Sequence, residues 1–147
     1  MDYFVDTNIL LRVLSPHATQ TQQARQALRS LRRSNQRLCI FSQVVMEFWS
    51  VCTRPKPPQS NGLGFSTAVA ERYVRFMEGF FTLLPDRPEI HTEWRRLTVT
   101  HEVTGRQVFD ARLAASMLVH GVPQILTFNV ADFQRYEGID AIHPEDV

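Results

Sequence analysis

The N-terminal stretch places a strand, a carboxylate and a helix in direct succession, and this order restricts the fold more than any other feature. Residues 3–5 are an apolar, β-favouring run that stops at Asp6, and apolar residues return at helical spacing over 9–14. An Asp between a strand and a helix lies at the carboxyl end of the strand, where open α/β sheets bind ligands. Thr7 and Asn8 suit a helix cap, so a plain strand–helix turn explains this stretch equally well.

The remainder of the chain alternates in the same way between short apolar strands and longer helices. Helices are predicted at 9–14, 19–33, 43–53, 67–78, from 88 onward and at 107–120. Strands are predicted at 3–5, 38–41, 80–84, 124–126 and 140–142. Ser42 and Ser66 are predicted helix caps, and Ser15-Pro16-His17 is a predicted break. This order predicts an α/β fold with a central, mostly parallel sheet of four to five short strands, and 147 residues fit one domain spanning 1–147.

Arginine carries nearly all of the positive charge. The sequence has 16 basic residues, of which Lys56 alone is a lysine, and a formal net charge of +1. Arginine binds phosphate through two N–H groups and stacks on bases, which suits nucleic acid, although a GC-rich genome would produce the same bias. Four arginines lie on the polar face of the predicted 19–33 helix: Arg25, Arg29, Arg32 and Arg33. This face is either simply exposed to solvent or binds phosphate groups.

The cysteines and apolar runs indicate a cytoplasmic protein. Cys39 and Cys52 both lie in apolar surroundings, so we expect them to be reduced core residues. The apolar runs are broken well short of a membrane span, and no charged and apolar leader precedes the first strand. We therefore expect neither a membrane helix nor a signal peptide.

Two further carboxylates lie within otherwise apolar helices. Glu47 is the one charged residue of the predicted 43–53 helix, and no side chain one turn away carries a positive charge. Because a buried, unpaired carboxylate is strongly unfavourable, Glu47 needs a distant partner, a proton or a cation. Asp110 falls in the first turn of the 107–120 helix, where the helix dipole favours an acid, although Phe109, Leu113 and Met117 suggest that this helix presses onto the sheet with Asp110 beside that face.

Polar residues also follow the strand at 124–126. In a parallel sheet the carboxyl ends of strands share one edge, so Asp6, Asn129 and Asp132 lie at the same edge, and Glu47 and Asp110 can converge there. Carboxylates brought together in apolar surroundings stay ionised only when a cation joins them, and oxygen ligands favour Mg²⁺ or Mn²⁺ over zinc. Such a site in an arginine-rich domain fits phosphodiester hydrolysis by a metal-activated water.

Other catalytic classes match the residues less well. The five histidines are scattered, and neither a G-x-S-x-G elbow nor a C-x-x-C pair is present. A haloacid-dehalogenase-type phosphatase also begins with a strand that ends in Asp, but it needs a second Asp where this chain has Asn8. Such a phosphatase also needs a lysine, and the one lysine of this chain, Lys56, lies in a proline-rich loop. The position of Lys56 also argues against P-loop phosphate binding, Schiff-base chemistry and receiver-type phosphorylation.

Four segments taken together carry a resemblance to a known family: 4–8, Glu47 in its apolar helix, 110–115, and 126–129 with 132–133. In this order and spacing they resemble a PIN domain, and more narrowly the VapC-type ribonuclease toxins of bacterial toxin–antitoxin pairs, from Tyr3 to about Tyr136. The resemblance implies an α/β/α sandwich and a Mg²⁺- or Mn²⁺-dependent endoribonuclease acting on tRNA or ribosomal RNA. It also implies a homodimer and a cognate antitoxin that blocks the site.

The resemblance assigns catalytic and metal-binding roles to four acids. Asp6, Glu47 and Asp110 match the first three acids of the family. Where many members have a fourth Asp, this chain has Asn129, and Asp132 three residues later is expected to supply the charge. We therefore expect one tightly held ion, coordinated by Asp6 and Asp110, with Glu47 and Asp132 acting directly or through water.

The remaining matched positions are expected to support the acids. Thr7 and Asn8 match the polar pair that orients Asp6, and Thr127 and Asn129 lie beside them at the sheet edge. Without the fourth acid, a PIN-like domain that binds RNA or a partner without cutting it is the main alternative. A structure-specific DNA nuclease of related fold is a second alternative, but such chains usually carry helical insertions for which this chain has no room.

Overall fold

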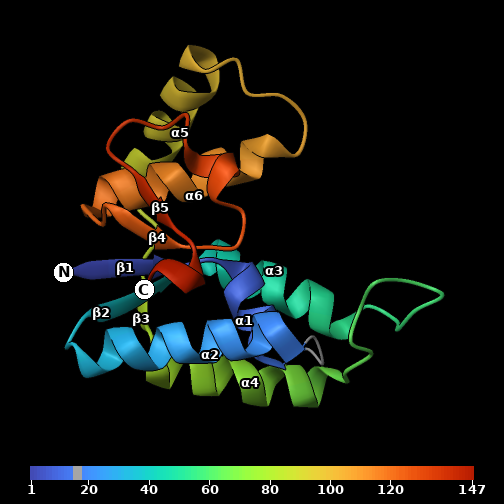
Figure 1. The fold of residues 1–147 in the computed structure, drawn as a ribbon. Coiled ribbons are helices and arrows are strands. Elements are labelled where there is room, and N and C mark those ends of the chain that lie inside the picture. Colours follow the sequence, from blue (N-terminus) through green and yellow to red (C-terminus); the bar gives the residue numbers. More distant parts are fainter. Residues whose placement is uncertain (15–17) are drawn as a thin grey trace.

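A computed structural model describes residues 1–14 and 18–147 (Figure 1). The predicted break at Ser15-Pro16-His17 lies outside the described residues. The described strands form one sheet in the order β3-β2-β1-β4-β5, and every pair of neighbours is parallel. Their bounds are β1 Asp2–Val5, β2 Arg37–Phe41, β3 Thr82–Leu84, β4 Gln124–Leu126 and β5 Asp140–Ile142. The prediction of an α/β fold with a short-stranded, mostly parallel sheet is confirmed.

The helices cover both faces of this sheet, as the sandwich prediction requires (Figure 1). One layer consists of α5 and α6, which pack closely on each other, and the other contains α1, α2 and α4 with α3 against α1 and α4. The helix bounds are α1 Thr7–Leu14, α2 Ala18–Arg33, α3 Ser42–Thr53, α4 Thr67–Phe80, α5 Pro88–Thr100 and α6 Gln107–His120. Two 3₁₀ turns follow, η1 Val130–Phe133 and η2 Pro144–Asp146.

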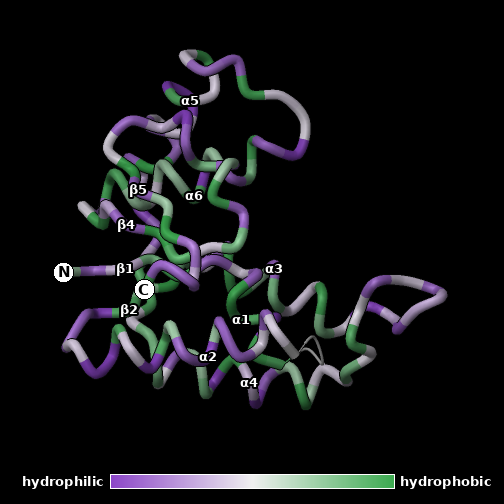
Figure 2. Tube along the Cα trace, in the orientation of Figure 1, coloured by the Kyte–Doolittle hydropathy of each residue, from purple (hydrophilic) through white to green (hydrophobic). Residues whose placement is uncertain are grey.

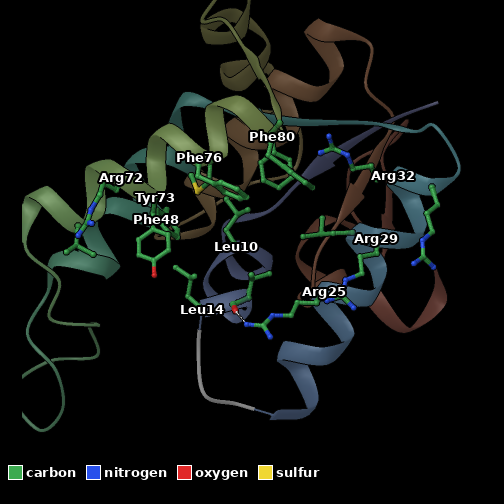
Figure 3. A pocket seen from close by; sticks show the side chains of 16 residues that line it. Leu10, Leu14, Arg25, Arg29, Arg32, Phe48, Arg72, Tyr73, Phe76 and Phe80 are labelled. Atoms are coloured by element: carbon green, nitrogen blue, oxygen red, sulfur yellow. Dashed lines mark hydrogen bonds between the residues drawn. The ribbon is translucent and has the colours of Figure 1, made fainter.

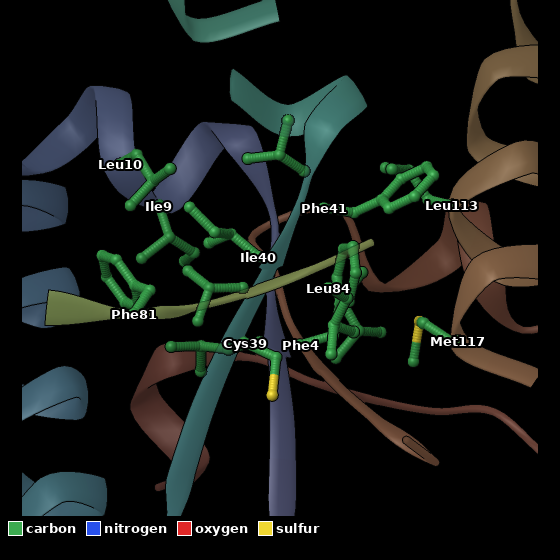
Figure 4. Close-up of a cluster of buried hydrophobic side chains, with 14 of the residues drawn as sticks. Phe4, Ile9, Leu10, Cys39, Ile40, Phe41, Phe81, Leu84, Leu113 and Met117 are labelled. Atoms are coloured by element: carbon green, nitrogen blue, oxygen red, sulfur yellow. The ribbon is translucent and has the colours of Figure 1, made fainter. Parts of the chain in front are cut away.

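The core lies on both sides of the central strand β1. Phe4 and Val5 are fully buried, and successive residues of a strand point to opposite faces. In Figure 4, Phe41 lies near Leu113 of α6, whereas Ile9 and Ile40 lie on the α1 side of the sheet. Figure 2 shows hydrophobic residues gathered along the strands and inner helix faces and hydrophilic residues in the loop between α3 and α4. The packing of both faces holds the carboxyl edge of β1 and β4 in place.

Local differences from the sequence predictions have identifiable causes. The predicted strand at 80–84 is shorter, because Phe80 continues α4 and packs its ring against Phe76 and Phe81. Ser66 caps α4 as predicted, but Ser42 is the first residue of α3 and donates its hydroxyl to Asp86 instead.

Five side chains bear on the expected environment of the core. Phe109 is 58% exposed and does not press onto the sheet, whereas Leu113 and Met117 do. Cys39 and Cys52 are buried free thiols, as predicted, and burial raises the pKa of Cys52 to about 11. In the part of the chain that the structure describes, no helix is long and apolar enough to cross a membrane.

Candidate active site

Asp6 lies directly after β1 and is held by neutral donors from two segments. Its side chain is 7% exposed. One carboxylate oxygen, Oδ1, accepts the Thr7 backbone N–H at 2.7 Å, and Oδ2 accepts the Thr127 hydroxyl at 2.8 Å and the Asn8 side-chain amide at 3.1 Å. Hydrogen bonds of this kind fix the orientation of a carboxylate without neutralising its charge.

Asn8 and Thr127 join the ends of β1 and β4. The Asn8 Oδ1 atom accepts the Phe128 backbone N–H at 3.2 Å, and its Nδ2 also lies 3.1 Å from Thr127 Oγ1. Thr127 is fully buried and accepts the Asn129 backbone N–H at 3.0 Å. The helix-capping explanation of Thr7 and Asn8 is therefore wrong, because Thr7 begins α1 and Asn8 bonds across the strand ends.

Glu47 enters the site from the second turn of α3. Its Oε2 accepts the Thr7 hydroxyl at 2.8 Å, and its Oε1 accepts the Gln43 side-chain amide at 2.8 Å. Thr7 is a distant hydrogen-bond partner, and Gln43, four residues earlier on the same helix, is a neutral partner that cannot cancel the charge, as the sequence indicated. The i, i+4 spacing places Gln43 beside Glu47, but it does not predict which atom of the amide faces the carboxylate.

Asp110 and Asp132 complete a group of acids whose charges act on Asp6 and Asp110. Burial raises the pKa of Asp110 to about 7, helped by the charges of Asp132, Asp6 and Glu47 and opposed by Arg135. Burial also raises the pKa of Asp6 to about 6, against the hydrogen bonds from Thr127 and Thr7 and together with the charges of Glu47 and Asp132. The predicted acids therefore come within electrostatic reach of one another.

The two predicted residues at η1 are more exposed than Asp6, which is buried, and than Glu47 and Asp110, which are half-buried. Asp132 lies in the turn itself and is exposed, and Asn129, just before it, is also exposed. Tyr136, which the sequence reasoning did not consider, is 2% exposed, and its hydroxyl has no hydrogen-bond partner among the described residues. Burial raises the pKa of Tyr136, and the charges of Asp110 and Asp132 raise it further against Arg135.

The donor set suits a hydrated divalent cation. In residues 1–14 and 18–147, no three His, Cys, Asp or Glu side chains are grouped closely enough to hold a metal by themselves. Burial raises the pKa values of Asp6 and Asp110, neighbouring acids raise them further, and a bound cation would favour the ionised forms of both. Mg²⁺ often uses one or two carboxylates and keeps several waters, so these residues fit Mg²⁺ or Mn²⁺ rather than an ion enclosed by protein ligands.

A separate groove lies between α1, α2 and α4. Its cavity volume is about 810 Å³, and its floor is apolar, with Leu10, Phe48 and Phe76 among the lining residues (Figure 3). Five arginines line it, and none of its described lining residues is acidic: Arg25, Arg29, Arg32, Arg33 and Arg72. The polar face that the sequence predicted for α2 thus borders this groove.

The chain is similar to known proteins along nearly its whole length. A sequence model described as the PIN domain matches residues 3–139. Among solved structures, VapBC2 from Rickettsia felis bound to a DNA fragment from their promoter gives a TM-score of 0.73 at 16% identity, covering 97% of this chain and 98% of that chain. VapBC-1 from nontypeable Haemophilus influenzae gives 0.71 at 18%, covering 99% of each chain, and a toxin–antitoxin complex from Klebsiella pneumoniae gives 0.68 at 20%, also covering 99% of each.

No curated protein sequence matches the chain. The solved structures share its fold at low identity, which agrees with the parallel sheet and flanking helix layers described above. Because the PIN-domain match covers residues 3–139, from β1 to just before β5, the chain belongs to the PIN-domain family.

Proposed function

We propose that this chain is a metal-dependent endoribonuclease that hydrolyses phosphodiester bonds in RNA and acts as the VapC-type toxin of a toxin–antitoxin pair. One observation carries the proposal: four acids from separate segments come together, because Thr7 bonds both Asp6 and Glu47, and the charges of Glu47 and Asp132 act on Asp6 and Asp110. Membership of the PIN-domain family, whose members include nucleases, supports the same activity.

The residues divide into holding, charge-supplying and orienting groups. Asp6 and Asp110 would hold one Mg²⁺ or Mn²⁺ ion, with Glu47 and Asp132 acting directly or through water. A bound divalent ion supplies an activated water and offsets charge on the phosphate. Thr7, Asn8 and Thr127 orient the acids through their hydrogen bonds, while Asn129 contributes its backbone N–H to Thr127. The RNA is tRNA or ribosomal RNA in this proposal, by resemblance.

The same proposal includes a cognate antitoxin as partner. The similar structures include VapBC assemblies and a toxin–antitoxin complex. The arginine-lined groove between α1, α2 and α4 would bind an acidic amphipathic helix of the antitoxin, with apolar residues on its floor and carboxylates against Arg25, Arg29 and Arg32. A homodimer and a cytoplasmic location complete the proposal by resemblance.

The test is cleavage of total cellular RNA by the pure, antitoxin-free protein with Mg²⁺ or with EDTA. We expect discrete fragments that require the metal and disappear in Asp6→Asn. Asp140→Asn, an exposed acid at the opposite end of the edge strand β5, is the matched control and should cleave like the wild type. Intact RNA in every lane, from protein shown to be folded by circular dichroism, would refute the nuclease.

A second candidate, a PIN-like domain that binds RNA or a partner without cutting it, has one observation in its favour. Asn129 stands where many family members carry an acid, and Asp132 nearby is exposed. Asn129→Asp distinguishes the two cases. If the natural site is active, this variant retains cleavage, whereas a site that has lost activity through Asn129 gains cleavage only in the variant.

A further inference from the structure

We infer that Gln43 is a positioning residue for Glu47 and that Arg112 fixes the orientation in which Gln43 acts. The inference rests on the proposed metal-dependent nuclease, because it concerns how one of the four acids is presented. Gln43 lies in the first turn of α3 and is 5% exposed, so it reaches the site from the interior of the protein.

The hydrogen bonds of Gln43 allow only one orientation of its side-chain amide. Its Nε2 lies 2.8 Å from Glu47 Oε1 and 2.9 Å from the Phe109 carbonyl oxygen, and both atoms are acceptors. Its Oε1 lies 3.3 Å from Arg112 Nη1, which is a donor. Reversing the amide would oppose acceptor to acceptor twice and donor to donor once. Arg112 and the Phe109 carbonyl therefore make Gln43 a donor to Glu47.

Arg112 is itself held away from Glu47. Its Nη2 donates to Asp86 Oδ1 at 3.1 Å, and its guanidinium lies 5.0 Å from the centre of the Phe41 ring. Asp86 is held in turn, because its Oδ2 accepts the Ser42 hydroxyl at 2.9 Å. The positive charge of Arg112 is thus paired with Asp86, and Gln43 lies between that pair and the site.

A neutral donor at this position has a specific consequence. An arginine bonded directly to Glu47 would neutralise its charge and compete with a cation, whereas the Gln43 amide orients the carboxylate and leaves the charge in place. The Thr7 hydroxyl does the same at the other oxygen. Each Glu47 oxygen accepts one neutral hydrogen bond and retains capacity toward the site.

The test compares Gln43→Met, which keeps side-chain length but cannot donate, with Gln124→Met as matched control. Gln124 is a half-buried glutamine at the amino end of β4, away from the acids. We expect Gln43→Met to lower the rate constant of RNA cleavage and to weaken Mn²⁺ binding to the metal-free protein, each by about tenfold. Mn²⁺ binding is measured by electron paramagnetic resonance, and Gln124→Met should change neither quantity.

A double-mutant cycle separates positioning from a structural effect. If Gln43 acts through Glu47, Gln43→Met lowers neither cleavage nor Mn²⁺ affinity further in a Glu47→Gln background. Arg112→Met leaves Gln43 intact but removes the donor that fixes its amide orientation, so it should also lower the rate constant of cleavage and the Mn²⁺ affinity. This variant serves as the test if Gln43→Met does not fold.

The outcomes distinguish the inference from the proposed function. If Gln43→Met cleaves RNA and binds Mn²⁺ as the wild type does, the inference is overturned and the proposed nuclease is unaffected. If only Arg112→Met folds, the same result in that variant has the same consequence. An equal loss from Gln43→Met with and without Glu47 would also overturn it. A wild-type protein that neither cleaves RNA nor binds Mn²⁺ would refute the proposed function, and the inference with it.

Discussion

Replacing Asp110 by Asn is expected to stabilise the metal-free protein at neutral and alkaline pH. The pKa of Asp110 is raised to about 7 from an ordinary value of 3.8, chiefly by burial and then by Asp132, Asp6 and Glu47. Between these two pH values the folded state binds the proton more tightly than the unfolded state does. The free energy of unfolding therefore falls as the pH rises through this window, and the whole penalty is present above about pH 7. An Asn side chain carries no charge and avoids the penalty.

The size of the effect follows from the pKa difference. At 1.36 kcal/mol per pKa unit, the ionised Asp110 side chain would destabilise the folded protein by at most about 4 kcal/mol. Asp110 is only partly buried, and its neighbours share the repulsion, so solvent screening reduces the effect considerably. We expect Asp110→Asn to gain about 1–2 kcal/mol at pH 8, which corresponds to an increase in Tm of about 3–6 °C for a chain of this length.

Thermal unfolding in EDTA at pH 8 and pH 4.5 measures this gain, with Asp140→Asn as the control for loss of an exposed acid. Asp110→Asn should melt above the wild type at pH 8 and close to it at pH 4.5, while Asp140→Asn follows the wild type at both. A variant that melts at or below the wild type at pH 8, or that gains equally at both pH values, would show that burial of charge at Asp110 does not limit stability.

Three other measurements address the metal, Tyr136 and the groove. Mg²⁺ at about 100 times its Kd should stabilise the wild type by about 2.7 kcal/mol and Asp6→Asn by much less, and unchanged melting of the wild type would contradict the metal site. Tyr136→Phe should keep or raise the stability toward urea, because the hydroxyl is buried with no partner among the described residues; a loss above about 1 kcal/mol would show that it is bonded. Arg29→Glu should weaken binding of an acidic antitoxin helix by about tenfold, measured by calorimetry at low salt, and should leave RNA cleavage unchanged. The control is Arg95→Glu, which changes an exposed arginine outside the groove and should not affect binding.

The fold could be predicted from sequence where local signals and tertiary packing agree. Helix α6 has the predicted bounds because Gly121 ends it in the left-handed conformation, with φ of 67°. Strands β4 and β5 also have the predicted bounds. The end of α4 was misplaced, because the ring contacts of Phe80 with neighbouring aromatic residues are not visible in a single-segment pattern.

The charged residues of the site could be predicted from sequence, because their charge and their order along the chain are visible there. The resemblance and the strand ends together indicated Asp6, Glu47 and Asp110, which do come within electrostatic reach of one another. The spacing places Gln43 one turn from Glu47, but the hydrogen bond between them depends on the amide orientation, which contacts from α6 determine. Arg112 lies two residues after Asp110 in sequence, yet its contacts are with Gln43 and Asp86, which only the packing of α6 beside α3 determines.

These contacts explain how the site keeps its charge. Every hydrogen bond that the structure gives to Asp6 and Glu47 comes from an uncharged donor, whether a hydroxyl, an amide or a backbone N–H. The nearby Arg112 is paired with Asp86 instead. An arginine bonded directly to the acids would lower their pKa values and stabilise the empty fold, but it would also remove the charge that binds a cation. Burial first, and then the charges of the neighbouring acids, raise the pKa values of Asp6 and Asp110, and a divalent ion bound under the proposed function would favour their ionised forms.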